Sequence, residues 1–240
     1  FAVLKAGGVA VGTMPLLRAK ELTDIVTKAE ISHALCDARL AQELDAARPH
    51  TPTLTRVVHF DGQAADGLEA RMATKDATFT AVDTAAEDTA LIAFTSGTTG
   101  KPKGTMHFHR DLIAACDCWP PAMLRASPDD MFTGSPPLAF TFGLGGLLFF
   151  PLRIGASTLL IERPAPDALL PAIAEHKATV LVTAPTSYRA MAAQVKEHDL
   201  SSLRKCVSAG EALPAVTRKL WRDATGIEIV DGIGSTEMLH

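Results

Sequence analysis

The chain has 240 residues, of which 47% are hydrophobic and 21% charged, which is typical of a globular protein and excludes a disordered one. Its formal net charge of −4 offers no basic surface that would follow a nucleic-acid backbone, so we expect no nucleic-acid partner. No secretory signal is visible, and no apolar run reaches the roughly 20 residues of a membrane-spanning helix, so we expect a cytoplasmic protein with no membrane partner.

Short apolar runs alternate along the chain with longer helical patterns. The expected strands are residues 8–12, 33–37, 56–60, 89–94, 131–135, 156–161, 178–184, 204–209 and 226–232. The expected helices are residues 18–30, 109–120, 166–177, 186–197 and 214–225. Such alternation predicts an α/β fold with largely parallel, helix-covered β-sheets. We expect the polar stretch 62–77 to be a surface excursion and the apolar stretch 142–155 to be buried.

Both ends of the chain look like cuts through a larger domain. The first residues, FAVLKAGGVAVG, read as the end of a helix that leads into a strand, with no initiator Met. The last residues, TEMLH, follow a strand and a turn. We therefore expect the 240 residues to be a piece of a longer polypeptide.

Two residue pairs invite a metal-site interpretation. Cys116 and Cys118 lie in an expected helix, where side chains two positions apart point to different faces, so they make a poor ligand pair. His107 and His109 are better explained as residues that flank the end of a strand and the start of the next helix. We expect neither pair to bind a metal.

Residues 95–104, TSGTTGKPKG, follow an apolar strand and combine glycines, hydroxyl residues and lysines. Such a loop can turn backbone N–H groups, hydroxyls and ammonium groups toward an anion. The Walker-type P-loop pattern fails here, because Thr95 stands where its first Gly is required and Pro102 where its Ser or Thr is required. On these residues alone, a solvated surface turn remains the alternative.

The longer stretch LIAFTSGTTGKPKGTMH, residues 91–107, resembles the signature loop of the adenylate-forming superfamily of acyl- and aryl-CoA synthetases, luciferases and peptide-synthetase adenylation domains. Three further stretches resemble its later motifs in the expected order. They are PPLAFTFGLGG (136–146), VSAGEALP (207–214) and DGIGSTEMLH (231–240). With residues 4–22, the resemblance covers essentially the whole chain. Many members carry an aromatic residue at the position of Asp231. An Asp at this position is similar to the benzoate/2-aminobenzoate-CoA ligase branch, and so are the motifs SAGEALP and GSTEMLH.

The resemblance implies ATP-dependent activation of an aromatic acid, of benzoate or aminobenzoate type, to an aryl-adenylate and then an aryl-CoA thioester. ATP, Mg²⁺ and coenzyme A would be the cofactors. The complete enzyme would be compatible with a homodimer. Residues 1–240 would form part of the large N-terminal ATP- and acyl-binding domain. The start and end of that domain, and a small C-terminal domain with a catalytic Lys, would be absent, leaving this chain unable to complete the reaction. The alternatives are an adenylation domain that loads a carrier protein and a non-catalytic module that binds nucleotide or aryl acid.

The resemblance also assigns site residues. Thr236 would orient the α-phosphate, Glu237 would hold Mg²⁺, and Lys103 would add positive charge. The expected nucleotide-binding residues are Thr95, Ser96, Gly97, Thr98, Thr99, Gly100, Lys103, Ala209, Gly210, Glu211, Asp231, Gly232 and Thr236. The expected aryl-acid pocket, flat and mainly apolar, is formed by Phe140, Ala184, Tyr188, Ala209, Ile233 and Gly234.

Several of these assignments have structural alternatives. Lys103 can be a solvated loop lysine, Phe140 an ordinary core residue, and Tyr188, the only tyrosine of the chain, a residue that packs a helix. Thr236 and Glu237 can simply begin a helix.

Overall fold

A computed structural model of the chain describes residues 1–95 and 102–240. It consists of two compact units, Phe1–Met106 and His107–His240. Their boundary lies near the end of the stretch 91–107 and not in the polar stretch 62–77. Within the described residues, no helix has both the length and the apolar character needed to cross a membrane.

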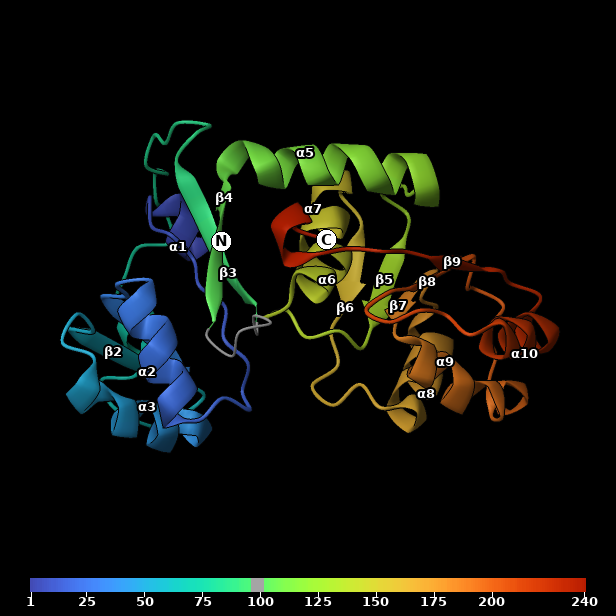
Figure 1. The fold of residues 1–240 in the computed structure, drawn as a ribbon, viewed down its shortest axis with the longest axis horizontal. Coiled ribbons are helices and arrows are strands. Elements are labelled where there is room, and N and C mark those ends of the chain that lie inside the picture. The colour runs from blue at the N-terminus through green and yellow to red at the C-terminus, as the bar shows by residue number, and fades with distance from the viewer. Residues whose placement is uncertain (96–101) are drawn as a thin grey trace. The chain divides into compact units, whose positions relative to one another are not determined.

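Two small sheets precede α5 in the chain (Figure 1). β1 (His33–Asp37) and β2 (Arg56–Phe60) of the first unit pair in parallel. β3 (Thr89–Thr95) of the same unit pairs with β4 (Lys103–Phe108), a strand that runs across the boundary after Met106. The helices of this unit are α1 (Ala2–Lys5), α2 (Ala19–Lys28), α3 (Ala41–Ala47) and α4 (Leu68–Met72), with short 3-10 turns at Ala38–Leu40 and Arg48–His50. A small core that includes Val26, Leu44 and Leu54 joins α2 and α3 to the β1–β2 sheet.

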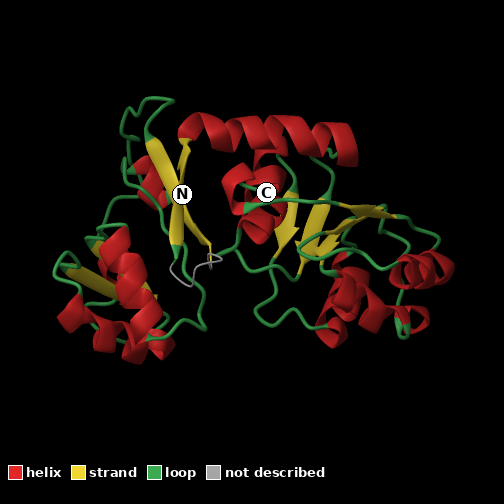
Figure 2. Cartoon of the chain, in the orientation of Figure 1, coloured by secondary structure: helices red, strands yellow, loops and turns green. Residues whose placement is uncertain are grey.

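The second unit is built on a five-stranded sheet with the order β6-β5-β7-β8-β9, and all of its strand pairs are parallel. Its strands are β5 (Met131–Gly134), β6 (Ser157–Leu159), β7 (Val180–Thr183), β8 (Lys205–Ser208) and β9 (Ile229–Asp231). A chain that returns to a parallel strand must cross over, and here α7, α8, α9 and α10 lie in the crossovers (Figure 2). All carboxyl ends of the strands therefore meet at one edge of the sheet.

The helices of the second unit begin with α5 (His109–Trp119), where the Asp111 carboxylate accepts a hydrogen bond from the backbone N–H of Phe108 at 2.8 Å. This bond satisfies one free N–H at the helix start. The remaining helices are α6 (Thr141–Leu144), α7 (Phe150–Ile154), α8 (Pro166–His176), α9 (Pro185–Ala192) and α10 (Ala215–Thr225). Five-residue π-helical turns follow α5 at Pro120–Leu124 and α6 at Gly145–Phe149, and 3-10 turns lie at Val195–Glu197 and Thr236–Met238.

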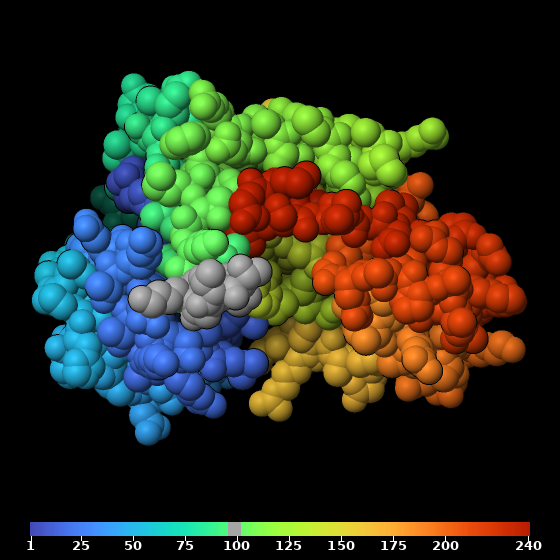
Figure 3. Space-filling model, viewed as in Figure 1, coloured from blue at the N-terminus to red at the C-terminus, as the bar shows by residue number. Residues whose placement is uncertain are grey.

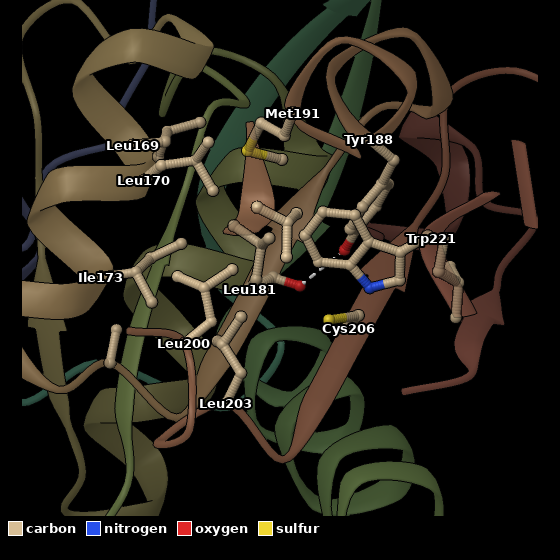
Figure 4. Close-up of a cluster of buried hydrophobic side chains, with 13 residues drawn as sticks. Leu169, Leu170, Ile173, Leu181, Tyr188, Met191, Leu200, Leu203, Cys206 and Trp221 are labelled. Carbon is tan, nitrogen blue, oxygen red and sulfur yellow. Dashed lines mark hydrogen bonds between the residues drawn. The ribbon is translucent and has the colours of Figure 1, made fainter. Parts of the chain in front are cut away.

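Side chains alternate between the two faces of this sheet. Cys206 of β8 belongs to a core cluster with residues of α8, α9 and α10, and Figure 4 shows this cluster around Trp221. Val207, the next residue of β8, belongs to a second cluster with Leu124 and Leu147. The strands are therefore covered on both faces, which explains why the sequence shows continuous apolar runs rather than strict polar alternation.

The predicted α/β architecture with parallel sheets is confirmed, and residues 33–37 and 56–60 form strands with the predicted bounds. The prediction of a strand at residues 8–12 is wrong, because within this stretch only Ala10 forms an isolated β-bridge, which pairs it with Leu91. The helix expected at 186–197 spans Pro185–Ala192 and then gives way to a 3-10 turn. Cys116 is buried and Cys118 exposed, as their spacing on one helix predicts.

An ion pair between a buried carboxylate, Asp130, and a partly exposed guanidinium, Arg204, lies at the amino end of the sheet in the second unit. Asp130, only 4% exposed, precedes β5 and accepts hydrogen bonds from the Arg204 guanidinium, including one from Nε at 2.6 Å, and from the Thr179 hydroxyl at 2.7 Å. Burial alone would raise the pKa of Asp130, but these hydrogen bonds outweigh it and lower the pKa to about 2. Arg204 precedes β8 and Thr179 precedes β7, so one carboxylate ties three neighbouring strands together.

We predict that Arg204→Ala lowers the free energy of unfolding of the second unit by about 3 kcal/mol, because it leaves the buried Asp130 carboxylate without its partner. The matched control is Arg153→Ala, which removes an ion pair to Asp117 in which both side chains are about half exposed. We expect that control to lose less than about 1 kcal/mol. Urea unfolding followed by tryptophan fluorescence measures this unit alone, since both tryptophans belong to it. Equal losses of unfolding free energy in the two variants would contradict a special role of the Asp130–Arg204 pair in stabilising this unit.

The same pair predicts a pH dependence. The pKa of Asp130 lies lower in the folded chain than its ordinary value of 3.8. Its contribution to stability is therefore complete above that value and disappears as the pH falls from 3.8 toward 2. We expect the stability difference between the native chain and Arg204→Ala to shrink over this interval in urea titrations. A difference that stays constant from pH 6 to pH 3 would argue against the assignment.

Candidate functional site

A pocket of about 390 Å³ lies at the carboxyl ends of β5, β7 and β8 in the second unit. In parallel sheets covered by helices, ligands bind in the crevice outside these strand ends. The lining residues come from the segments that follow each strand and from α6; they are Ser135, Pro136, Pro137, Phe140, Phe142, Ala184, Ala209, Gly210 and Glu211. Five predicted site residues are thus brought together here: Phe140, Ala184, Ala209, Gly210 and Glu211.

One wall of the pocket is the start of α6. Phe140 lies just before this helix with 51% of its surface exposed, and Phe142 lies inside it. The helix approaches the preceding segment very closely at Gly143, where a Cβ atom would lie 2.2 Å from the Pro137 carbonyl oxygen and 2.4 Å from that of Pro136. Only glycine allows this close approach of α6 to the two prolines, which line the same pocket as Phe140 and Phe142.

The opposite wall is the turn after β8. Gly210 has a φ of +91°, a backbone conformation that side chains disfavour, although a Cβ there would meet no atom within 4 Å. The backbone N–H of Gly232 donates to the Ser208 carbonyl at 2.8 Å and joins this turn to the end of β9. The predicted nucleotide-binding residues 209–211 and 231–232 therefore lie on adjacent strand ends. The Asp231 carboxylate lies 3.7 Å from the Arg218 guanidinium.

Thr236 and Glu237 belong to the 3-10 turn Thr236–Met238 in the carboxyl-terminal segment. This segment, red in Figure 3, lies on the surface of the second unit. His107, which is 3% exposed, contacts the Thr236 carbonyl oxygen through Nε2 at 2.7 Å. A carbonyl oxygen can only accept, so His107 Nε2 carries the proton and donates. The bond spans 129 residues of sequence and fixes the backbone of the turn that presents Glu237.

A second contact holds the same segment. The His240 ring lies among aromatic rings, with centroids 4.7 Å from Phe150 and 5.8 Å from the pocket residue Phe142. Burial lowers the pKa of His240 to about 4, so this ring is neutral near pH 7. The segment that carries Thr236 is thus anchored next to α6.

The Glu237 side chain fits a magnesium ligand in chemistry and exposure. Its carboxylate is exposed on an anchored turn, and carboxylate oxygen is the ligand type that Mg²⁺ prefers. Among residues 1–95 and 102–240, no group of three or more His, Cys, Asp or Glu side chains forms a metal cage.

Tyr188 does not line the pocket. It is completely buried, and its hydroxyl donates to the carbonyl oxygens of Leu181 at 3.1 Å and Val207 at 2.9 Å. Figure 4 shows its ring beside Trp221, and the two centroids lie 4.8 Å apart. The prediction that Tyr188 contacts the aryl acid is wrong, because its one polar atom bonds the backbone of two strands beneath the helix α9.

Ile233 and Gly234 are also absent from the pocket lining formed by the described residues. Ile233 is 98% exposed. A Cβ on Gly234 would lie 2.3 Å from the His240 carbonyl oxygen, so this glycine permits the tight carboxyl-terminal turn. The contact of these two residues with the aryl acid stays a prediction.

The predicted phosphate loop belongs to the first unit. Thr95 ends β3 and Lys103, which is exposed, begins β4. Ser96, Gly97, Thr98, Thr99 and Gly100 lie outside the described residues. A Cβ on Gly104 would lie 3.0 Å from the Ile92 side chain, so the two strands that flank the loop pack closely.

Sequence reasoning missed three residues of this site. The local sequence places His107 only at the end of a strand. No local pattern indicates its contact with Thr236, which lies far along the chain. Phe142 lies in the same motif as Phe140, with a glycine after it that would have been a signal for close packing. Ser135 directly precedes the motif at the end of an expected strand, a position that commonly faces ligands in parallel sheets.

We predict that His107→Leu accelerates hydrogen exchange in the segment 229–240 and lowers the free energy of unfolding by about 1–2 kcal/mol, because the Thr236 carbonyl loses its donor. His107→Gln keeps an N–H of similar reach and should retain most of the protection. His109→Leu, two residues further on, is the matched control. If exchange in this segment is as slow in His107→Leu as in the native chain, the hydrogen bond does not hold the turn.

Comparison with known proteins adds independent findings. A family model described as AMP-binding enzyme matches residues 1–240. The chain is 36% identical over 241 residues to the benzoate–CoA ligase of Thauera aromatica, with 99% of this chain and 46% of that protein covered. It is 33% identical to a 4-hydroxybenzoate–CoA/benzoate–CoA ligase of Rhodopseudomonas palustris, with 100% and 46% covered.

Among solved structures, the anthranilate CoA ligase AuaEII in complex with anthranoyl-AMP superimposes with a TM-score of 0.91 at 34% identity. That match covers 99% of this chain and 47% of the solved one. A benzoate CoA ligase from Burkholderia xenovorans LB400 superimposes with a TM-score of 0.85 at 30% identity, with 99% and 48% covered. The chain spans about half the length of the curated relatives it matches.

Proposed function

This chain belongs to the AMP-binding enzyme family, and we propose that the protein carrying it activates an aromatic carboxylic acid with ATP and transfers the aroyl group to coenzyme A. The observation that carries the proposal is the pocket at the carboxyl ends of β5, β7 and β8. It combines two aromatic rings, Phe140 and Phe142, with the small side chains Ala184 and Ala209. A mainly apolar pocket of this size and lining suits a single ring better than a long acyl chain.

The first step would join the acid to the nucleotide. A carboxylate oxygen of the acid attacks the α-phosphorus of ATP, a new O–P bond forms, and the bond to pyrophosphate breaks. In the second step the sulfur of coenzyme A attacks the acyl carbon, and AMP leaves as the thioester forms. Transfers of this kind require positioned groups and charge stabilisation more than covalent participation by the protein.

The residues of the second unit suit the first step. The turn of residues 209–211 and the adjacent residues Asp231 and Gly232 would lie along the adenine. The Thr236 hydroxyl would orient the α-phosphate, and Mg²⁺ held by Glu237 would reduce the negative charge that builds on the phosphates. His107 would not touch substrate; it would keep the backbone of Thr236 in place.

The resemblance assigns the phosphate contacts to the loop of residues 95–104. Lys103 would add positive charge, while Thr95, Ser96, Thr98 and Thr99 would donate hydroxyl hydrogen bonds and Gly97 and Gly100 backbone N–H groups to the pyrophosphate portion of ATP. In this proposal residues 1–240 act as part of a larger N-terminal ATP- and acyl-binding domain, together with a further domain that carries a catalytic lysine. The support is the match to about half the length of each curated relative.

We predict that the protein as its gene encodes it catalyses ATP–pyrophosphate exchange with benzoate or an aminobenzoate and forms the corresponding aryl-CoA. The 240-residue chain alone should not form the thioester at a comparable rate. Exchange measured across benzoate, aminobenzoates, hydroxybenzoates and medium-chain fatty acids tests the substrate class. Exchange with fatty acids only would contradict it, and discharge onto a carrier protein instead of coenzyme A would favour a carrier-loading adenylation domain.

We predict that Glu237→Gln slows adenylate formation on the order of 100-fold, because it removes a charged oxygen that acts on the reacting phosphates. Its effect on thermal unfolding should be small, since this side chain is exposed. Glu197→Gln is the matched control, because Glu197 is an exposed glutamate in another 3-10 turn of the same unit. An exchange rate that matches the native protein over a magnesium titration would exclude a metal role for Glu237.

A further inference from the structure

Three hydroxyl residues form a row across the sheet beside the pocket. Thr183 ends β7 and pairs in register with Ser208, the last residue of β8. On the other side of Thr183, Gly134 of β5 pairs with Val182, and the next residue, Ser135, donates its backbone N–H to the Val182 carbonyl at 3.2 Å. The order across the three strands is therefore Ser135, Thr183, Ser208.

The middle of this row is completely buried, and one end reaches the pocket. Thr183 and Ser208 are both 0% exposed, whereas Ser135 is half-buried and lines the pocket. The Ser135 and Thr183 hydroxyl oxygens lie 2.5 Å apart and share a hydrogen bond. The Ser208 hydroxyl, on the other side of Thr183, is buried without a hydrogen-bond partner among the described residues.

The single bond between Ser135 and Thr183 leaves Ser135 with unused hydrogen-bonding capacity. A hydroxyl has one proton to donate and two lone pairs that accept. If Thr183 donates, the Ser135 proton is available; if Ser135 donates, its lone pairs are available. In both arrangements Ser135, which lines the pocket, keeps a donor or an acceptor for a further partner.

Few side chains of the pocket can make such a bond. Of the described residues that line it, Ser135 and Glu211 alone have polar side-chain atoms. Glu211 is exposed, whereas the Ser135 hydroxyl is hydrogen-bonded to the buried Thr183 hydroxyl. An apolar pocket discriminates weakly against an added or missing polar group, but a site with an oriented hydrogen-bonding group discriminates more strongly.

We infer that Ser135, oriented by Thr183, recognises a hydrogen-bonding substituent, an amino or hydroxyl group, on the ring of the aromatic acid. This inference rests on the proposed function and deepens it, since it concerns the choice among aromatic acids. Ser135 is the residue that contacts the substituent, and Thr183 is a positioning residue that acts through Ser135. Unsubstituted benzoate leaves Ser135 without this partner and is the poorer substrate.

The test uses the protein as its gene encodes it and compares kcat/KM for benzoate with kcat/KM for the preferred isomer among the amino- and hydroxybenzoates. We expect Ser135→Ala to lower the preference for the substituted acid by about fivefold to tenfold, the effect of losing one hydrogen bond. Thr183→Val should lower the same ratio, and Thr183→Ser, which keeps the hydroxyl, should restore it. Thr186→Val, which changes an exposed threonine of α9 outside the pocket, is the matched control and should leave the ratio unchanged.

Three results would overturn the inference. The first is a native protein that prefers benzoate to every substituted acid. The second is a ratio unchanged in Ser135→Ala, and the third is an equal loss for both acids, which would place Ser135 at the carboxylate or the nucleotide. Rescue in Thr183→Ser separates orientation of Ser135 from a general loss of packing. A native protein that activates no aromatic acid at all is a different outcome, because it rejects the proposed function itself.

Discussion

The ion pair between the buried Asp130 carboxylate and the partly exposed Arg204 guanidinium is the interaction on which the second unit depends. It lies at the amino end of the sheet, with Thr179 as a third member, and it ties together the strands β5, β7 and β8 where they begin. These are parallel strands of nearly equal length, so fixing their starts also fixes where they end. Desolvation makes the pair unfavourable unless all its hydrogen bonds form, and this requirement favours one register over its neighbours.

The pocket is a consequence of that register. Because the three strands end at one level, the segments after them turn away from the sheet together and leave a crevice, with Ser135 on one side and Ala209 on the other. Close approach at Gly143 and the left-handed backbone of Gly210 then set its two walls. Ser135, Thr183 and Ser208 lie at this same level. The Asp130–Arg204 pair at one end of the sheet therefore helps to position the Ser135 hydroxyl at the other end.

Much of the fold was predictable from sequence because parallel strands covered on both faces produce distinct apolar runs, as at β7. The pocket residues in the motifs around Phe140 and Ala209 were predictable for another reason, since each directly follows such a strand. Contacts between distant segments were not predictable. Tyr188 is a plausible pocket residue by position, and only the packed structure shows its hydroxyl bound to two backbone carbonyls. The bond from His107 to Thr236 likewise depends on how a strand end and the last turn meet.

The central claim is that the crevice at the carboxyl ends of β5, β7 and β8 holds the ring of an aromatic acid. A crystal structure of the protein bound to a non-hydrolysable aryl-adenylate analogue tests it most directly. We predict electron density for the ring between Phe140 and Ala209, with the adenine along the turn that contains Gly210. A ring located outside this crevice, with the crevice filled by solvent, would contradict the account.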